Sequence, residues 1–178
     1  MSTSTEESFT LLCVDDEANI LSSLRRLFRP HGYKVLVAGG GAEGLEMLSQ
    51  EHVDLIISDM RMPGMDGATF LAEARRRHPD TVRLLLTGYA DMESTVAAIN
   101  AGQIARYISK PWNDQDVVLT VREALERKAL EREKARLEAL TRSQNEELKS
   151  LNASLEEKVE ARTGELKIAH EKLKQSFL

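Results

Sequence analysis

The sequence predicts an α/β domain with a doubly wound, five-stranded parallel sheet, followed by one long helix. Three observations support this prediction. Short apolar runs alternate with helical patterns up to Trp112. These runs are continuously apolar, which is typical of parallel strands buried on both faces. The 66 residues after Trp112 contain one glycine and no proline, whereas the segment up to Trp112 holds nine glycines and all four prolines.

Each predicted strand is a short apolar run, and the runs lie at 9–14, 33–38, 53–58, 82–86 and 106–109. Apolar residues at helical spacing predict helices between the strands, at 20–28, around 45–48, at 68–77 and at 91–101. Pro30 and Gly32 end the first of these helices. A final helix begins after Asn113 and has no stop signal over residues 114–177.

Composition and charge exclude several classes of protein. No run of about 18 apolar residues is present, so we expect no membrane span. The N-terminus is polar and acidic, unlike a secretory signal. A single cysteine cannot build a disulfide framework, so we expect a cytoplasmic protein. Residues 1–121 carry 11 basic and 17 acidic groups, and residues 122–178 carry 13 and 12, so we expect no nucleic-acid partner.

Polar side chains follow four of the predicted strands. Asp15 and Asp16 follow the first strand, Asp59 the third, Thr87 the fourth and Lys110 the fifth. Because the carboxyl ends of parallel strands meet at one edge, we expect these side chains to lie together. Three carboxylates repel one another unless a cation joins them, and Mg²⁺ accepts carboxylates, water and a phosphoryl oxygen as ligands. With a lysine and a hydroxyl nearby, the set predicts phosphoryl transfer to a carboxylate.

Two other interpretations concern the same region. The three aspartates could simply cap the helices that follow their strands. The coincidence of these carboxylates with a threonine and a lysine, each at a strand end, favours a site instead.

Gly39 to Gly44 fits the G-x-G-x-x-G spacing of dinucleotide-binding proteins. That motif follows the second strand, and a second mononucleotide-binding half is missing, so we interpret it as a flexible turn between a strand and a helix.

Residues 9–121 resemble the receiver domain of two-component response regulators, a CheY-like domain with a flavodoxin-like fold. The resemblance rests on CVDDE, ISDMRMPGMDG, LLTGYA and YISKPW, at 13–17, 57–67, 85–90 and 107–112. It implies that Asp59 is the phosphoacceptor and that a sensor histidine kinase is the phosphodonor. It implies no independent enzyme beyond self-catalysed phosphorylation and dephosphorylation of this aspartate.

The resemblance also assigns the metal ligands. Asp16 and Asp59 would hold Mg²⁺, with the backbone carbonyl of Arg61 as a third ligand. Asp15 would belong to the outer shell of the same acidic pocket.

Four further residues have implied roles in the switch. Lys110 would pair with the phosphoryl group, and Pro111 after it is cis in this family. Thr87 would turn its hydroxyl onto the phosphoryl group, and Tyr107 would turn inward to fill the space left behind. An alternative for Tyr107 is that of a plain strand aromatic packed on a helix. The switch would then alter the surface of the fourth helix, fifth strand and fifth helix.

Heptad spacing predicts a coiled coil within the long helix. The interface positions are Leu130, Lys134, Leu137, Thr141, Gln144, Leu148, Leu151 and Leu155, and then Val159, Arg162, Leu166, Ala169 and Leu173. The four-residue step from Leu155 to Val159 is a stutter, which unwinds a supercoil locally. Polar residues at interface positions reduce stability, so we expect a weak, parallel homodimer. A solvated single helix held by charge pairs is the alternative.

We expect three segments: a disordered N-terminus at 1–8, a receiver at 9–125 and a signalling coiled coil at 126–178. The stretch LEEKVEARTGEL at 155–166 resembles the linkers before HD-GYP cyclic-di-GMP phosphodiesterase domains. We therefore expect a truncated chain whose missing output domain is of that kind. The alternative function is a phosphorylation-independent, receiver-like dimerisation module, but loss of the aspartate or lysine, its usual sign, is absent.

Overall fold

The structure is a computed structural model that describes residues 8–101 and 104–178. The chain divides into two compact units, one ending at Ala129 and the other running from Leu130 to Leu178. Helix α5 (Asp114–Ser176) contributes residues to both units. The N-terminal segment predicted to be disordered lies, apart from Ser8, outside the described residues.

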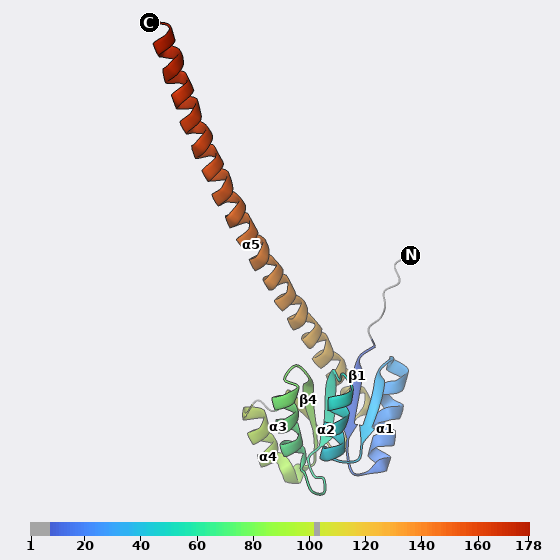
Figure 1. The fold of residues 1–178 in the computed structure, drawn as a ribbon. Coiled ribbons are helices and arrows are strands. Elements are labelled where there is room, and N and C mark those ends of the chain that lie inside the picture. Colours follow the sequence, from blue (N-terminus) through green and yellow to red (C-terminus); the bar gives the residue numbers. More distant parts are fainter. Residues whose placement is uncertain (1–7, 102–103) are drawn as a thin grey trace. The chain divides into compact units, whose positions relative to one another are not determined.

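A five-stranded parallel sheet forms the centre of the first unit, which confirms the predicted fold class (Figure 1). Its strands are β1 (Thr10–Val14), β2 (Lys34–Ala38), β3 (Leu55–Asp59), β4 (Val82–Thr87) and β5 (Arg106–Ser109). The order in space is β2-β1-β3-β4-β5. The winding direction therefore changes between β1 and β3, and ligands bind at the carboxyl ends of strands at such a switch point.

The helices agree with the sequence-based prediction except near their ends. They are α1 (Ala18–Phe28), α2 (Gly41–Gln50), α3 (Gly67–Arg77), α4 (Met92–Asn100) and α5, with 3₁₀ turns η1 (Arg29–His31) and η2 (Tyr89–Asp91). The α4 helix starts later than predicted because η2 occupies the preceding residues. The carboxylate of Asp66 accepts a hydrogen bond from the Thr69 amide at 2.7 Å and caps α3. Asn113 caps α5 in the same way, accepting from the Gln115 amide at 2.9 Å.

Successive strand residues face opposite sides of the sheet, so each strand contributes to two hydrophobic cores. On one face, Ile56 lies in the same core as Phe70 of α3. On the other face, Ile57 lies with Phe28 of α1 and Val121 of α5. All five side chains are fully buried. Burial on both faces explains why the strands read as continuous apolar runs.

Helix α2 begins at Gly41, so the interpretation of 39–44 as a flexible turn holds for Gly39 and Gly40 and is wrong from Gly41 onward. A Cβ atom at Gly41 would lie 2.7 Å from the sulfur of Met65, and one at Gly44 would lie 2.9 Å from the ring of Phe70. Both distances are too short for a side chain. These glycines are therefore explained by close packing.

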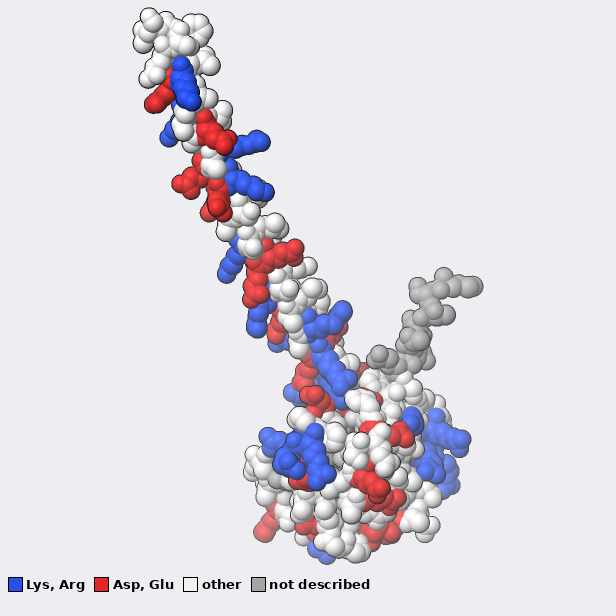
Figure 2. All heavy atoms as spheres, in the orientation of Figure 1, with Lys and Arg blue, Asp and Glu red and all other residues white. Residues whose placement is uncertain are grey.

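The second unit consists of the remainder of α5 and the two residues after it, and every residue from Leu130 to Leu178 is exposed. Basic and acidic side chains alternate along the part of this helix in view (Figure 2). Across residues 8–101 and 104–178, none of the helices has the length and apolar character needed to cross a membrane.

Candidate functional site

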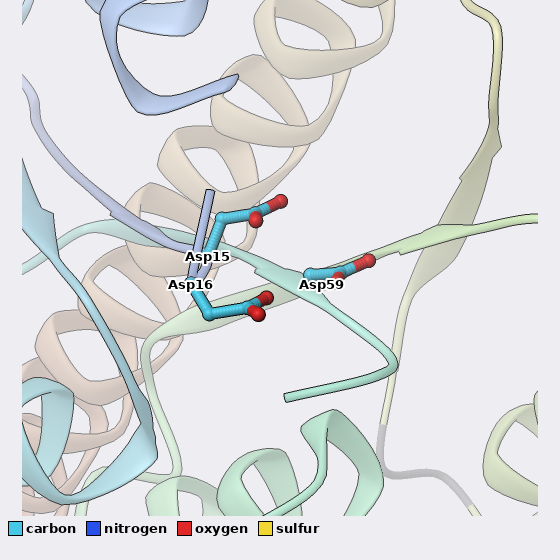
Figure 3. Close-up of side chains that lie close together, drawn as sticks. All are labelled: Asp15, Asp16 and Asp59. Carbon is cyan, nitrogen blue, oxygen red and sulfur yellow. The ribbon is translucent and has the colours of Figure 1, made fainter. Parts of the chain in front are cut away.

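Three carboxylates meet at the carboxyl edge of the sheet, where the switch point predicts a ligand site. Asp59 is the last residue of β3, and Asp15 and Asp16 directly follow β1. One oxygen from each lies within 4.8 Å of the others. Figure 3 shows the three side chains extending in the same direction. Asp15 and Asp59 are buried, whereas Asp16 is exposed, so the cluster opens to solvent on one side.

Lys110 brings a positive charge into this cluster from the end of β5. Its Nζ donates a hydrogen bond to Oδ1 of Asp59 at 2.7 Å and lies 3.6 Å from Oδ2 of Asp15. Partial burial alone would lower the pKa of Lys110, but the hydrogen bond and charge of Asp59, together with Asp15, outweigh it and raise this pKa. The backbone amide of Lys110 donates to the Thr87 carbonyl at 2.8 Å. The peptide bond between Lys110 and Pro111 is cis.

Asp15 has one oxygen that is incompletely satisfied. Its Oδ1 accepts a hydrogen bond from the Glu17 amide at 2.8 Å. Its Oδ2 is buried and has no hydrogen-bond partner among the described residues. Burial raises the pKa of the Asp15 carboxyl; the Glu17 hydrogen bond opposes this rise, and the charge of Asp59 adds to it. A buried oxygen without a donor, beside two further carboxylates, fits a divalent cation such as Mg²⁺.

Thr87, at the end of β4, faces a partner that the sequence did not reveal. Its hydroxyl oxygen lies 3.1 Å from the hydroxyl of Thr95 in α4 and 3.2 Å from the carbonyl oxygen of Gly88. Both threonines are buried. The only sequence signal for Thr95 is its position four residues after Asp91, on the same side of a helix.

Arg61 extends toward the start of α4. Its Nε donates a hydrogen bond to Oδ1 of Asp91 at 2.7 Å. Met62, Pro63 and Ser94, among others, line a cleft of about 480 Å³ between the loop after β3 and α4. Asp91 therefore joins this loop to α4, a role that nothing in its sequence neighbourhood indicates.

Tyr107 lies on β5 with 43% of its surface exposed, so the structure holds it in an outward position. Its predicted inward turn, like the predicted use of the Arg61 carbonyl as a metal ligand, stays a prediction.

Gly67 fixes the backbone behind the acidic cluster. A Cβ atom at this position would lie 2.0 Å from the carbonyl oxygen of Asp59. The Gly67 amide also donates a hydrogen bond to the Met60 carbonyl at 2.8 Å. The start of α3 and the end of β3 are therefore in direct backbone contact.

A parallel sheet of this order, with an acidic cluster and a lysine at its switch point, defines a class of signalling domain. Residues 11–122 match the family described as "Response regulator receiver domain". The chain belongs to this family and contains the receiver domain of a two-component response regulator, whose acidic pocket is formed by Asp15, Asp16 and Asp59. Receiver domains of this kind accept phosphate from histidine kinases.

Similar proteins differ in what accompanies the receiver. The chain is 37% identical over 133 residues to the hydrogenase transcriptional regulatory protein HoxA of Cupriavidus necator, covering 75% of this chain and 27% of that protein. It is 41% identical to the signal receiver domain of an HD domain-containing protein from Pseudomonas fluorescens, with a TM-score of 0.69, covering 75% of this chain and 97% of that structure. An adenylate cyclase structure from Rhodopirellula baltica is 30% identical, with a TM-score of 0.69 and coverages of 73% and 96%. The chain spans about a quarter of the curated relatives that it matches, as the 27% and 25% coverages of two HoxA proteins illustrate.

Proposed function

We propose that Asp59 accepts a phosphoryl group from a phosphohistidine of a sensor histidine kinase. A carboxylate oxygen of Asp59 attacks the phosphorus, the P–N bond breaks, and its electron pair stays on the imidazole nitrogen. The observation that carries this proposal is the lysine at 2.7 Å from Asp59, within a cluster of three carboxylates. Lys110 screens the charge that would otherwise repel an incoming phosphoryl group.

The other site residues have roles that follow from this chemistry. Asp16, Asp59 and the Arg61 carbonyl would hold Mg²⁺, with Asp15 in the outer shell. The ion, when bound, neutralises charge on the phosphoryl oxygens. The Lys110 ammonium would move from the Asp59 carboxylate to a phosphoryl oxygen, because the phosphoryl group carries the larger negative charge.

Two more residues would complete the switch. Thr87 would donate its hydroxyl proton to the same phosphoryl group, and Tyr107 would turn inward. The change would alter the surface of α4, β5 and α5 and so reach the long helix.

We also propose that residues 9–125 form the receiver and residues 126–178 a homodimeric coiled coil leading to an output domain. Large apolar side chains are exposed at the predicted interface positions, including Leu137, Leu151 and Leu166. The likeness of 155–166 to HD-GYP linkers, and the similarity to the receiver of an HD domain-containing protein, support an HD-GYP-type output. Among the described residues, the acidic pocket is the one cluster of His, Cys, Asp or Glu that could hold a metal ion. The catalytic metal cluster of an HD-GYP output domain would therefore have to come from other residues.

The test uses beryllofluoride, a mimic of the phosphoryl group, added to the whole chain with Mg²⁺. We expect a saturable change in the fluorescence of Trp112, which lies two residues after Lys110 and packs at the edge of one core. Incubation with a small-molecule phosphodonor is expected to add the mass of one phosphoryl group.

Asp59→Asn removes the nucleophile and is expected to abolish both responses. Asp80→Asn makes the same chemical change at an exposed turn residue and is the matched control. Equal responses of wild type and Asp59→Asn, or no response in wild type, would overturn the proposal. That result would favour the phosphorylation-independent dimerisation module instead.

A further inference from the structure

Thr95 occupies an unusual position for a helix hydroxyl, since it is completely buried and lies against the end of a neighbouring strand. Its Oγ1 donates a hydrogen bond to the backbone carbonyl of Asp91 at 2.8 Å. The same Oγ1 lies 3.1 Å from Oγ1 of Thr87, which is 1% exposed. Two buried hydroxyls therefore form a chain from the strand end to the first turn of α4.

Counting protons fixes the direction of this chain. A threonine hydroxyl has one proton to donate and two lone pairs that accept. Thr95 uses its proton on the Asp91 carbonyl, which is the shorter of its two contacts. The Thr95 oxygen must then accept from Thr87. The single proton of Thr87 is thus committed to Thr95, with the Gly88 carbonyl at 3.2 Å as the competing acceptor.

We propose that Thr95 is a positioning residue for Thr87. Its oxygen accepts the hydrogen bond of the Thr87 hydroxyl while Asp59 is unmodified, and the phosphoryl group accepts this hydrogen bond instead once Asp59 is phosphorylated. This inference rests on the proposed phosphorylation of Asp59. Thr87 cannot donate its one proton to both acceptors, so the two hydrogen bonds exclude each other. A phosphoryl oxygen is charged and is the stronger acceptor, so phosphorylation releases Thr87 from α4.

The hydrogen bond to Thr95 therefore stabilises the resting state selectively. Any interaction made in only one of two states shifts the equilibrium between them by its own free energy. Removing the Thr95 acceptor should make the phosphorylated-like state easier to reach. The effect would appear as tighter binding of a phosphoryl mimic, although Thr95 has no place among the predicted ligands of that mimic.

The experiment measures the apparent Kd for beryllofluoride at saturating Mg²⁺, from Trp112 fluorescence of the whole chain. Thr95→Val keeps the shape of the side chain and removes the hydroxyl. We expect its apparent Kd to fall about threefold to tenfold, the usual weight of one hydrogen bond. Thr95→Ser restores the hydroxyl and is expected to match wild type. Thr95→Ala is a second variant without a hydroxyl, for use if the valine variant does not fold.

A double-mutant cycle separates this role from a merely structural one. In a Thr87→Val background the proton in question is gone, so adding Thr95→Val should leave the apparent Kd unchanged. An equal gain in both backgrounds, or no tightening in the single variant, would overturn the inference while wild-type binding keeps the proposed function intact. A wild-type protein that ignores beryllofluoride would remove the proposed function and this inference with it.

Discussion

The acidic pocket contains a buried carboxylate, Asp15, whose protonation we expect to compete with cation binding. Asp15 is fully buried, and its pKa is raised above the ordinary value of 3.8, first by burial and also by the charge of Asp59. A raised pKa means that the folded protein takes up this proton more readily than the unfolded chain. Without a cation, the stabilising contribution of the protonated form is present at low pH and is lost as the pH rises through the pKa of Asp15.

We therefore expect Mg²⁺ affinity to fall as the pH is lowered from neutrality through this pKa. A protonated Asp15 carboxyl is neutral and no longer attracts the cation. Because one proton is involved, the Mg²⁺ affinity should fall at most about tenfold per pH unit. Magnesium titrations followed by Trp112 fluorescence at a series of pH values measure this slope. Asp15→Asn should bind Mg²⁺ more weakly and with a flatter pH profile. The same pH profile in wild type and in Asp15→Asn would contradict the assignment.

Residues at strand ends were predictable, and their partners were not. Asp15, Asp16 and Asp59 stand directly after apolar runs, and a parallel sheet brings such positions to one edge. Thr95 and Asp91 act through contacts across α4, at distances that depend on how that helix packs on the sheet. Side-chain type alone carries no information about that packing.

At the scale of elements, the last buried turn of α5 is tied to the opposite end of the sheet. Nζ of Lys128 donates a hydrogen bond to the Asp54 carbonyl at 3.1 Å and lies 3.6 Å from its Oδ1. Asp54 also accepts from the Thr10 amide at 2.9 Å, and both charged residues are buried. A buried charge that loses its partner is costly, so this pair fixes α5 against the starts of β1 and β3.

We expect Lys128→Met to lower the free energy of unfolding of the first unit by about 3 kcal/mol, because it removes the buried ammonium group beside the Asp54 carboxylate and leaves it only the Thr10 amide and the exposed His52 ring at 3.2 Å. Equilibrium urea unfolding followed by Trp112 fluorescence measures the loss. Lys149→Met makes the same substitution at an exposed position of the same helix and should change stability by less than about 0.5 kcal/mol. Equal effects of the two substitutions would show that the buried pair does not anchor the helix.

Element types were predicted from periodicity, while several boundaries depended on local contacts. The strand predicted at 53–58 is formed by Leu55–Asp59, because Asp54 turns its side chain to the Thr10 amide before the strand begins. The glycines of α2 mark close packing against Met65 and Phe70, and a sequence pattern cannot distinguish this from a turn.

On the scale of the whole chain, the proposed coiled coil would cover leucines of residues 130–178 that are exposed in the single chain. Residues 130–178 present exposed apolar side chains at heptad spacing. Figure 2 shows charges of both signs interspersed along this helix. Burying such a stripe against a second copy is the usual solution for a helix of this kind. The predicted interface positions state which leucines the second copy should cover and which should stay exposed.

Two leucines with matched exposure distinguish a coiled-coil interface from nonspecific hydrophobic association. Leu151 is at a predicted interface position and is 53% exposed, and Leu140 is outside the predicted set and is 51% exposed. We expect Leu151→Gln to weaken dimerisation on the order of a hundredfold, since two copies lose their burial, and Leu140→Gln to have much less effect. Sedimentation equilibrium over a range of concentrations measures both. A monomeric wild type, or equal losses in the two variants, would count against the predicted interface.

For the whole chain, the fold of the first unit could be predicted from the sequence, and the partner of the long helix could not. The doubly wound parallel sheet followed from the strand pattern, because five buried runs joined by helices have few ways to wind. The pairing proposed for the long helix would involve a second molecule, and one chain would contain only half of that interface.

The backbone contact at Gly67 limits how the pocket can respond to a ligand. With no room for even one methyl group between α3 and the carbonyl of Asp59, that wall behaves as a single stiff piece. Displacement caused by an incoming group must then be absorbed across the pocket, where hydroxyls and an ion pair hold α4 by contacts that can be exchanged. We therefore expect α4 to move on ligand binding while β3 and α3 stay in place. A side chain at residue 67 would displace β3 and α3 instead of α4.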